Sequence, residues 1–280
     1  NLENILIGEP CLLDDIRNKI EPFRKNLPKR SKLYDNILPH IFNYSSFSKD
    51  GSDLNNPDRK LKWGAYKYIQ SLGIRSCPYC NRQFTFSITV SRLKKDGKTL
   101  TLKTIKPELD HFFPKSKYPY LAISLYNLIP SCTLCNCRLK HEREFELKTH
   151  LNPFIDSFHK LYKFKTTLQG TVPMGTSDPD FEIILEHQEK GETDNRVEGN
   201  IDVFCLRGLY NEHKDFVLTI INNSISYHQD HIDEINDLLP QQARVTRNEL
   251  KRIITGDYLD EKDISKEPLT KLKIDICKEY

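Results

Sequence analysis

Two Cys-x-x-Cys pairs constrain this chain more than any other feature of its sequence. Cys77 and Cys80 form the first pair, and Cys132 and Cys135 form the second. Thiols at this spacing in a reducing compartment favour metal binding over disulfide formation. Two such pairs are typical of a zinc site with four sulfur ligands. We therefore predict that the four cysteines converge on one structural Zn²⁺.

The other four cysteines have no partner at ligand spacing. We predict that each of them is a buried small hydrophobic residue rather than a nucleophile. They are Cys11, Cys137, Cys205 and Cys277.

The polar residues that point to chemistry lie between and just after the two pairs. The run Glu-Leu-Asp110-His111-Phe-Phe-Pro comes first, Asn127 follows, and Asn136 comes directly after the second pair. Hydrolysis of a phosphodiester needs a base that activates water and a cation that neutralises charge on the phosphate. Asp110 offers a carboxylate for a hard divalent ion, and His111 offers a base at neutral pH.

We expect a helix to begin near Asn136. An amide oxygen at that position could supply a second protein ligand to a magnesium ion, with water and phosphate completing the shell. Lys140 lies four residues further on and therefore on the same helical face. It is placed to contact a backbone phosphate. Lys115 and Lys117 could do the same or could serve solubility alone.

This stretch resembles the HNH endonucleases, or ββα-metal nucleases, that carry a Cys-x-x-Cys pair on each side of the motif. The resemblance implies that His111 is the general base and that Asn127 steadies the loop and orients His111. It also implies that Asp110 and Asn136 bind a catalytic Mg²⁺ or Mn²⁺, and that the paired cysteines hold structural zinc. Two departures are Asn136 in place of the final histidine and a gap of 51 residues between the pairs, which holds an inserted hairpin.

More loosely, the rest of the chain resembles the HNH subunits of bacterial anti-phage systems. These are the Septu and retron-associated nucleases that work with an ABC-type ATPase. The supporting residues are Leu151-Asn-Pro-Phe154, Phe158-His159 and Leu209-Tyr-Asn-Glu-His213. The resemblance implies an ATPase subunit as partner.

Hydrophobic periodicity predicts helices on both sides of the motif region. Before it we expect helices up to about residue 48, a polar loop over 48–57 and a helix that ends at Gly73. Alternation from Phe84 to Val90, followed by Asp96-Gly97, predicts a β-hairpin. Beyond residue 150 we expect strands at 181–186 and 201–206 and helices at 211–239, 246–255 and 268–279.

These elements predict an α+β chain in which a small ββα-metal HNH module with structural zinc is embedded in mainly helical flanking segments. The expected division is a helical segment over 1–74, the zinc-braced nuclease module over 75–148, and an acidic, mainly helical region over 149–280 that binds a partner.

The charge is divided unevenly along the 280 residues. Residues 1–148 carry 26 Lys and Arg against 15 Asp and Glu, a net charge of +11, whereas residues 149–280 carry a net charge of −8. A basic half suits a polyanion such as nucleic acid, and an acidic half does not. No apolar run approaches the roughly 20 residues that span a bilayer, and the first residues lack the pattern of a signal peptide. We expect a cytoplasmic protein that does not enter a membrane.

We predict a metal-dependent endonuclease that cleaves DNA as the effector of an anti-phage complex. One metal and one histidine do not distinguish the deoxyribose of DNA from the ribose of RNA. An RNA endonuclease of the same fold, acting for example on tRNA, is therefore an alternative. A non-catalytic zinc-ribbon that binds nucleic acid is a second alternative, although it has no use for Asp110-His111 with Asn136. A third is an assembly subunit that mainly binds an ATPase. We assign Tyr118-Pro119-Tyr120 to packing and His228 and His231 to an exposed helix face.

Overall fold

The computed structural model divides into two compact units, which are described separately below. Unit 1 comprises residues 1–157 and 195–204, and unit 2 comprises residues 158–194 and 205–280. The described residues are 1–26, 32–49, 63–93, 95–97, 99–168, 181–188, 194–227, 229–255 and 259–280. Most of the predicted polar loop at 48–57, and His228, lie outside them.

The described residues at the start of unit 1 form five helices, which confirms the helices predicted for the N-terminal segment. They are α1 Leu2–Ile7, α2 Pro10–Asn26, α3 Lys32–Ile41, α4 Tyr44–Lys49 and α5 Ala65–Leu72. Helix α5 ends as predicted at Gly73, whose left-handed backbone (φ 64°) suits a residue without a Cβ. Its buried face packs Ala65, Tyr68 and Ile69 against Leu109 and Leu128. The helix thereby supports the strands of the motif region.

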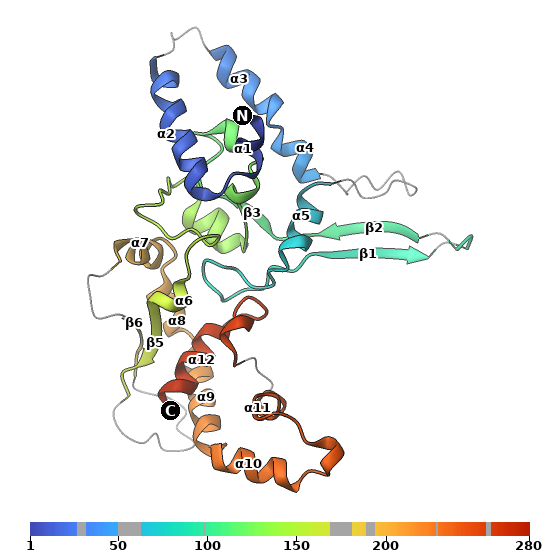
Figure 1. Ribbon diagram of the computed structural model, residues 1–280, viewed down its shortest axis with the longest axis vertical. Helices are drawn as coiled ribbons and strands as arrows, with labels where there is room; N and C mark the ends of the chain where they lie inside the picture. Colours follow the sequence, from blue (N-terminus) through green and yellow to red (C-terminus); the bar gives the residue numbers. More distant parts are fainter. Residues whose placement is uncertain are drawn as a thin grey trace. The chain divides into compact units, whose positions relative to one another are not determined.

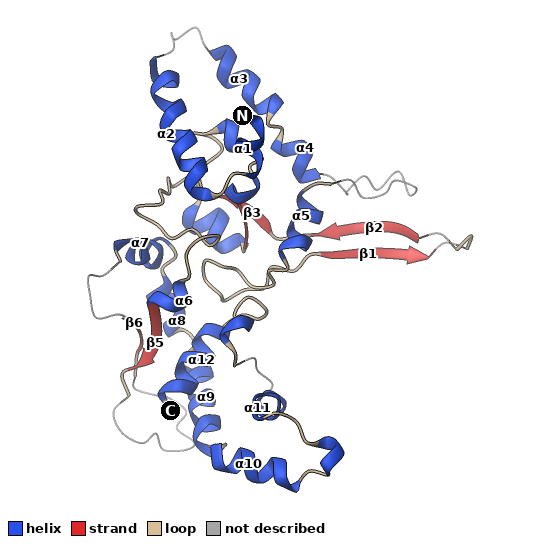
Figure 2. Ribbon diagram, viewed as in Figure 1, coloured by secondary structure: helices blue, strands red, loops and turns tan. Residues whose placement is uncertain are grey.

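The predicted hairpin is present and forms a sheet of its own. Strand β1 (Ile88–Leu93) pairs antiparallel with β2 (Thr99–Ile105), with a register shift between Val90 and Ser91. Gly97 has a φ of 80°, as the Asp-Gly turn requires. Among the described strands, β1 and β2 pair only with each other (Figure 2).

A second antiparallel pair, followed by a helix, carries the motif residues. Strand β3 (Glu108–His111) pairs with β4 (Leu128–Ser131). Two 3₁₀ turns, Pro119–Leu121 and Leu125–Asn127, lie in the connection between them. The π-helix Leu134–Lys140 follows β4. Buried Tyr118 and Tyr120 confirm that this aromatic cluster packs into the core.

The strand predicted at 201–206 is wrong. Residues Asn195–Val203 form helix α7, and helix α8 begins at Leu206. Val197 and Ile201 are buried in α7, four residues apart, so the apolar residues follow a helical period and not the period of two that a strand shows. The buried Asn200 of the same helix donates to and accepts from the backbone of Leu151 within unit 1.

The described residues of unit 2 form one strand pair and several helices (Figure 1). Strand β5 (Tyr162–Thr166) follows helix α6 (Phe158–Leu161) and pairs antiparallel with β6 (Ile183–His187), close to the predicted 181–186. Among the described residues, the predicted long helix at 211–239 is two helices, and the first ends at Ser226. The helices are α8 Leu206–Asn211, α9 Lys214–Ser226, α10 Gln229–Leu238, α11 Arg247–Thr255 and α12 Thr270–Glu279. The last two confirm the helices predicted there.

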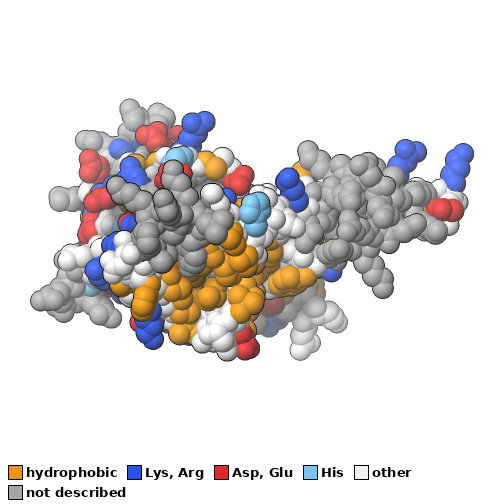
Figure 3. Space-filling model, turned by 90° about the horizontal axis from the view of Figure 1, so that it is seen from above, with side chains coloured by type: hydrophobic (Ala, Val, Ile, Leu, Met, Phe, Trp, Pro, Cys, Tyr) orange, Lys and Arg blue, Asp and Glu red, His pale blue; other side chains and the backbone are white. Residues whose placement is uncertain are grey.

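Helices and short antiparallel strand pairs together confirm an α+β chain. Segments 1–74 and 75–148 of the predicted division lie together in unit 1. Among the described residues, no helix is long and apolar enough to cross a membrane. Hydrophobic side chains gather on the face shown in Figure 3. The large exposed hydrophobic residues of the N-terminal helices are Leu2, Ile7, Leu12, Phe23, Ile37 and Ile41.

Candidate metal centre and the adjoining polar cluster

The two cysteine pairs meet in unit 1. The sulfur atoms of Cys77, Cys80, Cys132 and Cys135 all lie within 4.8 Å of one another, and all four residues are buried. The Cys80 and Cys132 sulfurs are 3.9 Å apart. A tetrahedral zinc with Zn–S bonds of about 2.3 Å requires sulfurs roughly 3.8 Å apart. The cluster could therefore hold a zinc ion.

Backbone N–H groups donate hydrogen bonds to two of the four sulfurs. The backbone N–H of Arg82 donates to the Cys80 sulfur, and that of Cys135 donates to the Cys132 sulfur, each at 3.4 Å. Asn81 adopts a left-handed backbone (φ 45°), and its N–H donates to the Cys77 carbonyl at 2.7 Å. Asparagine tolerates this conformation better than most residues, so the turn after the first pair is tight at small cost.

The thiols also influence one another's protonation. Hydrogen bonds from the neighbouring thiols, from Cys135 first, lower the pKa of the Cys132 thiol well below its usual range. Zinc binds the thiolate and displaces the proton. The cluster therefore favours the ionised form of at least one ligand.

Asp110 lies beside the cysteine cluster and accepts a hydrogen bond on each carboxylate oxygen. The Tyr79 hydroxyl donates to Oδ2 at 2.6 Å, and the Lys140 ammonium lies 3.1 Å from Oδ1. The Lys140 Nζ also donates to the His111 carbonyl at 2.7 Å. Asp110 and Lys140 are 2% and 1% exposed. Such a buried ion pair needs this additional bonding to offset the desolvation of both charges.

His111 ends strand β3 and is held by the loop that follows it. One ring nitrogen, Nε2, lies 2.9 Å from the Ala122 carbonyl, and the ring meets the edge of Tyr44. A carbonyl only accepts, so Nε2 carries the hydrogen of the neutral ring and Nδ1 carries the lone pair. Burial lowers the pKa of His111 to about 3. The imidazole is therefore neutral near pH 7, the form in which it can accept a proton.

Asn127 binds the loop that carries the Ala122 carbonyl. Its Oδ1 accepts from the Phe113 N–H at 2.8 Å, while its Nδ2 donates to the carbonyls of Phe113 and Leu121. The side chain is fully buried. These three bonds close the loop between β3 and β4 and place Ala122 next to His111.

Asn136 and Lys140 lie on the same π-helix but differ in exposure. Asn136 is partly exposed, and its N–H donates to the Cys132 carbonyl at 3.0 Å. Lys140, predicted to contact phosphate, points instead at Asp110 and the ring of Phe145. Lys140 thus contacts the Asp110 carboxylate and the His111 backbone carbonyl, and Asn127 holds the adjoining loop.

Several contributors were not apparent from sequence. Tyr79, Tyr44 and the Ala122 carbonyl contact the motif residues, yet only Tyr79 had a signal, its place inside the first cysteine pair. The prediction that the four cysteines outside the two Cys-x-x-Cys pairs are buried is wrong. Cys11, Cys137 and Cys205 are exposed and Cys277 is partly exposed.

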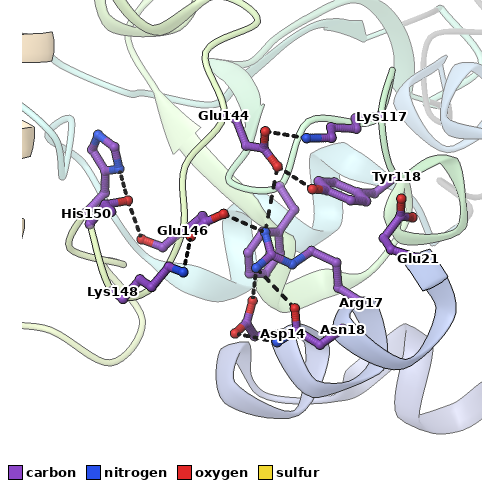
Figure 4. Close-up of polar contacts among 12 residues, drawn as sticks. Asp14, Arg17, Asn18, Glu21, Lys117, Tyr118, Glu144, Glu146, Lys148 and His150 are labelled. Carbon is purple, nitrogen blue, oxygen red and sulfur yellow. Dashed lines mark hydrogen bonds and ion pairs between the residues drawn. The ribbon is translucent and has the colours of Figure 1, made fainter. Parts of the chain in front are cut away.

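A charged cluster around Arg17 attaches helix α2 to the motif region (Figure 4). The Arg17 guanidinium is 2.8 Å from the Asp14 carboxylate and 3.9 Å from those of Glu144 and Glu146. It also stacks over the ring of Phe113 at 5.0 Å. Glu144 in turn binds Lys117 and Tyr118. Lys117, a possible phosphate contact by sequence, therefore forms an ion pair with Glu144.

Comparison with known proteins finds one limited similarity. A stretch of 50 residues, 18% of the chain, is 38% identical to Septu protein PtuB from Bacillus thuringiensis. The match spans about a fifth of the length of that relative. No protein-family model matches the chain. No solved structure matches it.

Proposed function

We propose that this chain is a divalent-metal-dependent endonuclease of the HNH type that cleaves DNA. One observation carries the proposal. The strand–strand–helix order of β3, β4 and the π-helix gathers Asp110, His111 and Lys140 beside the four-cysteine cluster, with Asn127 closing the loop. This arrangement places a neutral imidazole and a carboxylate on consecutive residues of one strand.

The residues divide the chemistry between them. His111 accepts the proton of the attacking water at Nδ1. Asp110 and Asn136 would hold Mg²⁺ or Mn²⁺, which supplies charge neutralisation at the phosphate when bound. The donor set suits these ions because both residues offer oxygen atoms. Each Asp110 oxygen keeps a lone pair beyond the one that Tyr79 or Lys140 uses.

The hairpin supports a nucleic-acid substrate. Residues 81–106 contain seven Lys and Arg and one acidic residue, a net charge of +6. Arg92 and Lys95 are exposed, as are Phe84 and Phe86, whose rings stack with centroids 4.3 Å apart. A two-stranded β-ribbon fits the major groove of a duplex. The hairpin leads within three residues into β3 and so joins a duplex contact to Asp110 and His111.

One observation favours a second candidate, a zinc-ribbon that binds nucleic acid without cleaving it. Asp110 is 2% exposed and engaged by protein donors at both oxygens, and His111 is 8% exposed. Residues with a purely structural role would be expected to have such burial.

The similarity to Septu protein PtuB supports a role in anti-phage defence. We propose that the chain acts there with an ABC-type ATPase, the partner implied by the family resemblance.

The deciding experiment is incubation of the purified chain with plasmid DNA and with total RNA. Each substrate is tested with Mg²⁺, with Mn²⁺ and with EDTA. Metal-dependent cleavage of DNA supports the proposal, and cleavage of RNA alone redirects it to an RNA endonuclease. Binding of either nucleic acid without cleavage, also in the presence of the partner ATPase, would establish the zinc-ribbon alternative.

A further inference from the structure

Tyr79 occupies a position that joins the cysteine cluster to Asp110. It lies between the two ligands of the first pair, in the run Cys77-Pro-Tyr-Cys80. Its hydroxyl donates to Asp110 Oδ2 at 2.6 Å, and the side chain is 5% exposed. A displacement of the first pair therefore moves the hydroxyl that Asp110 contacts.

The Tyr79 ring is held from two further sides within unit 1. It stacks on Phe204 with ring centroids 4.5 Å apart and meets the edge of Phe145 at 6.4 Å. Aromatic side chains packed in this way have little freedom, so the hydroxyl occupies a defined place. Removal of the hydroxyl alone would leave these ring contacts intact.

The second cysteine pair makes the matching connection. The π-helix that contains Cys135 ends at Lys140, whose ammonium lies 3.1 Å from Asp110 Oδ1. Each pair of the cluster thus supplies one donor to one oxygen of the same carboxylate. An ion bound by all four sulfurs would hold in place the two segments that carry these donors.

We propose that Tyr79 is a positioning residue that couples the cysteine cluster to the divalent-metal site by orienting the Asp110 carboxylate. The inference rests on the proposed function for the identity of that second site. Hydrogen bonds that orient a ligating carboxylate typically change metal affinity or activity by about 10- to 100-fold when removed. Tyr79 supplies such a bond without neutralising the carboxylate charge.

The test compares Mn²⁺ binding by full-length, zinc-loaded variants, measured as free Mn²⁺ by electron paramagnetic resonance. Tyr79→Phe should retain zinc and raise the dissociation constant for Mn²⁺ by about 10- to 100-fold. The matched control is Tyr120→Phe, because the buried Tyr120 hydroxyl likewise donates to a carboxylate, that of Glu21. It should bind Mn²⁺ as the wild type does. Asp110→Ala should abolish the binding.

A kinetic readout separates positioning from general support of the fold. In Tyr79→Phe, the Mg²⁺ concentration for half-maximal cleavage should rise, while saturating Mg²⁺ restores most of kcat. Unchanged Mn²⁺ affinity with zinc retained would overturn the inference and leave the proposed function standing. Loss of zinc from Tyr79→Phe would also overturn it, because Tyr79 would then serve the cysteine cluster. Unchanged Mn²⁺ binding by Asp110→Ala would refute the proposed metal site, and the inference with it.

Discussion

His111 shows how single residues of this site depend on their surroundings. The Ala122 carbonyl selects the tautomer with its lone pair on Nδ1, and burial keeps the ring neutral. Neither effect comes from the Asp-His dipeptide itself. The hydrogen bond comes from the loop that Asn127 closes between β3 and β4, and Tyr44 of helix α4 adds to the burial.

We predict that His111→Ala slows nucleic-acid cleavage by about 10²- to 10⁴-fold, because a positioned general base contributes that range. The zinc content should stay close to that of the wild type, and the variant should remain folded at the assay temperature although it unfolds at a lower temperature. The rate is measured on plasmid DNA at saturating Mg²⁺. His141→Ala provides a matched control on an exposed histidine. Near-normal turnover of His111→Ala would remove this residue from the mechanism.

At the scale of structural elements, the cysteine cluster joins two segments more than 50 residues apart in sequence. One is the turn around Cys77 and Cys80, and the other is the start of the π-helix. A shared ion would hold these segments together against the conformational entropy of the chain between them.

We predict that Cys132→Ser purifies with less zinc than the wild type, which should contain one ion per chain. Loss of a structural zinc removes a binding free energy on the order of 10 kcal/mol. The free energy of unfolding should therefore fall by more than the roughly 1 kcal/mol typical of point substitutions. Elemental analysis and thermal unfolding measure the two effects. The control is Cys137→Ser, at an exposed cysteine five residues away. Equal zinc content in both variants would argue against a four-cysteine site.

The β1–β2 hairpin is the second element with a testable role. We predict that the double variant Arg92→Glu/Lys95→Glu, made in the His111→Ala background to prevent cleavage, binds duplex DNA more weakly. The dependence of its affinity on salt should be shallower by about one unit of slope for each phosphate that the hairpin no longer neutralises. Fluorescence anisotropy across a salt series measures both quantities.

The control for the hairpin makes the same change of charge on helix α2. Lys19→Glu/Lys25→Glu alters two exposed lysines of unit 1. If the hairpin contacts DNA, Arg92→Glu/Lys95→Glu should bind duplex DNA more weakly than Lys19→Glu/Lys25→Glu does. An equal loss of DNA affinity in both double variants would show that overall charge causes the effect and would contradict a hairpin contact.

At the scale of the whole molecule, the chain has a basic first half and an acidic second half. Nucleic acid attracts the first and repels the second, so the acidic helices are available for protein contacts. Control by a second subunit would also protect the host from an active nuclease. Residues 195–204 lie in the acidic half of the sequence but belong to unit 1.

We predict that residues 150–280 carry the main contact with an ATPase partner and that the isolated chain cleaves poorly. The full chain should co-purify with an ATPase encoded beside it, and cross-links should map mainly to residues 158–194 and 205–280. Adding that ATPase should increase the cleavage rate. Full activity of the isolated chain, together with no binding to the proteins encoded by neighbouring genes, would contradict this prediction.

Elements that depend on local pattern could be predicted from the sequence. The helix before Gly73, the Asp96-Gly97 hairpin and helices α11 and α12 all follow from periodicity and turn residues. The strand expected at 201–206 failed because a short apolar run fits either period until its packing is known. In the structure, the burial of Val197 and Ile201, four residues apart, shows that this segment packs as helix α7.

The sequence by itself determined the convergence of the four cysteines, because their spacing fits a single tetrahedral ion. Together with the resemblance to HNH nucleases, it also singled out one group of site residues, namely Asp110, His111, Asn127, Asn136 and Lys140. Only the tertiary structure decided that Tyr79 and Lys140 bind the two Asp110 oxygens and that Lys140 is buried. These contacts join residues about 30 positions apart in sequence. Their existence depends on side-chain direction and burial, which spacing along the chain does not specify.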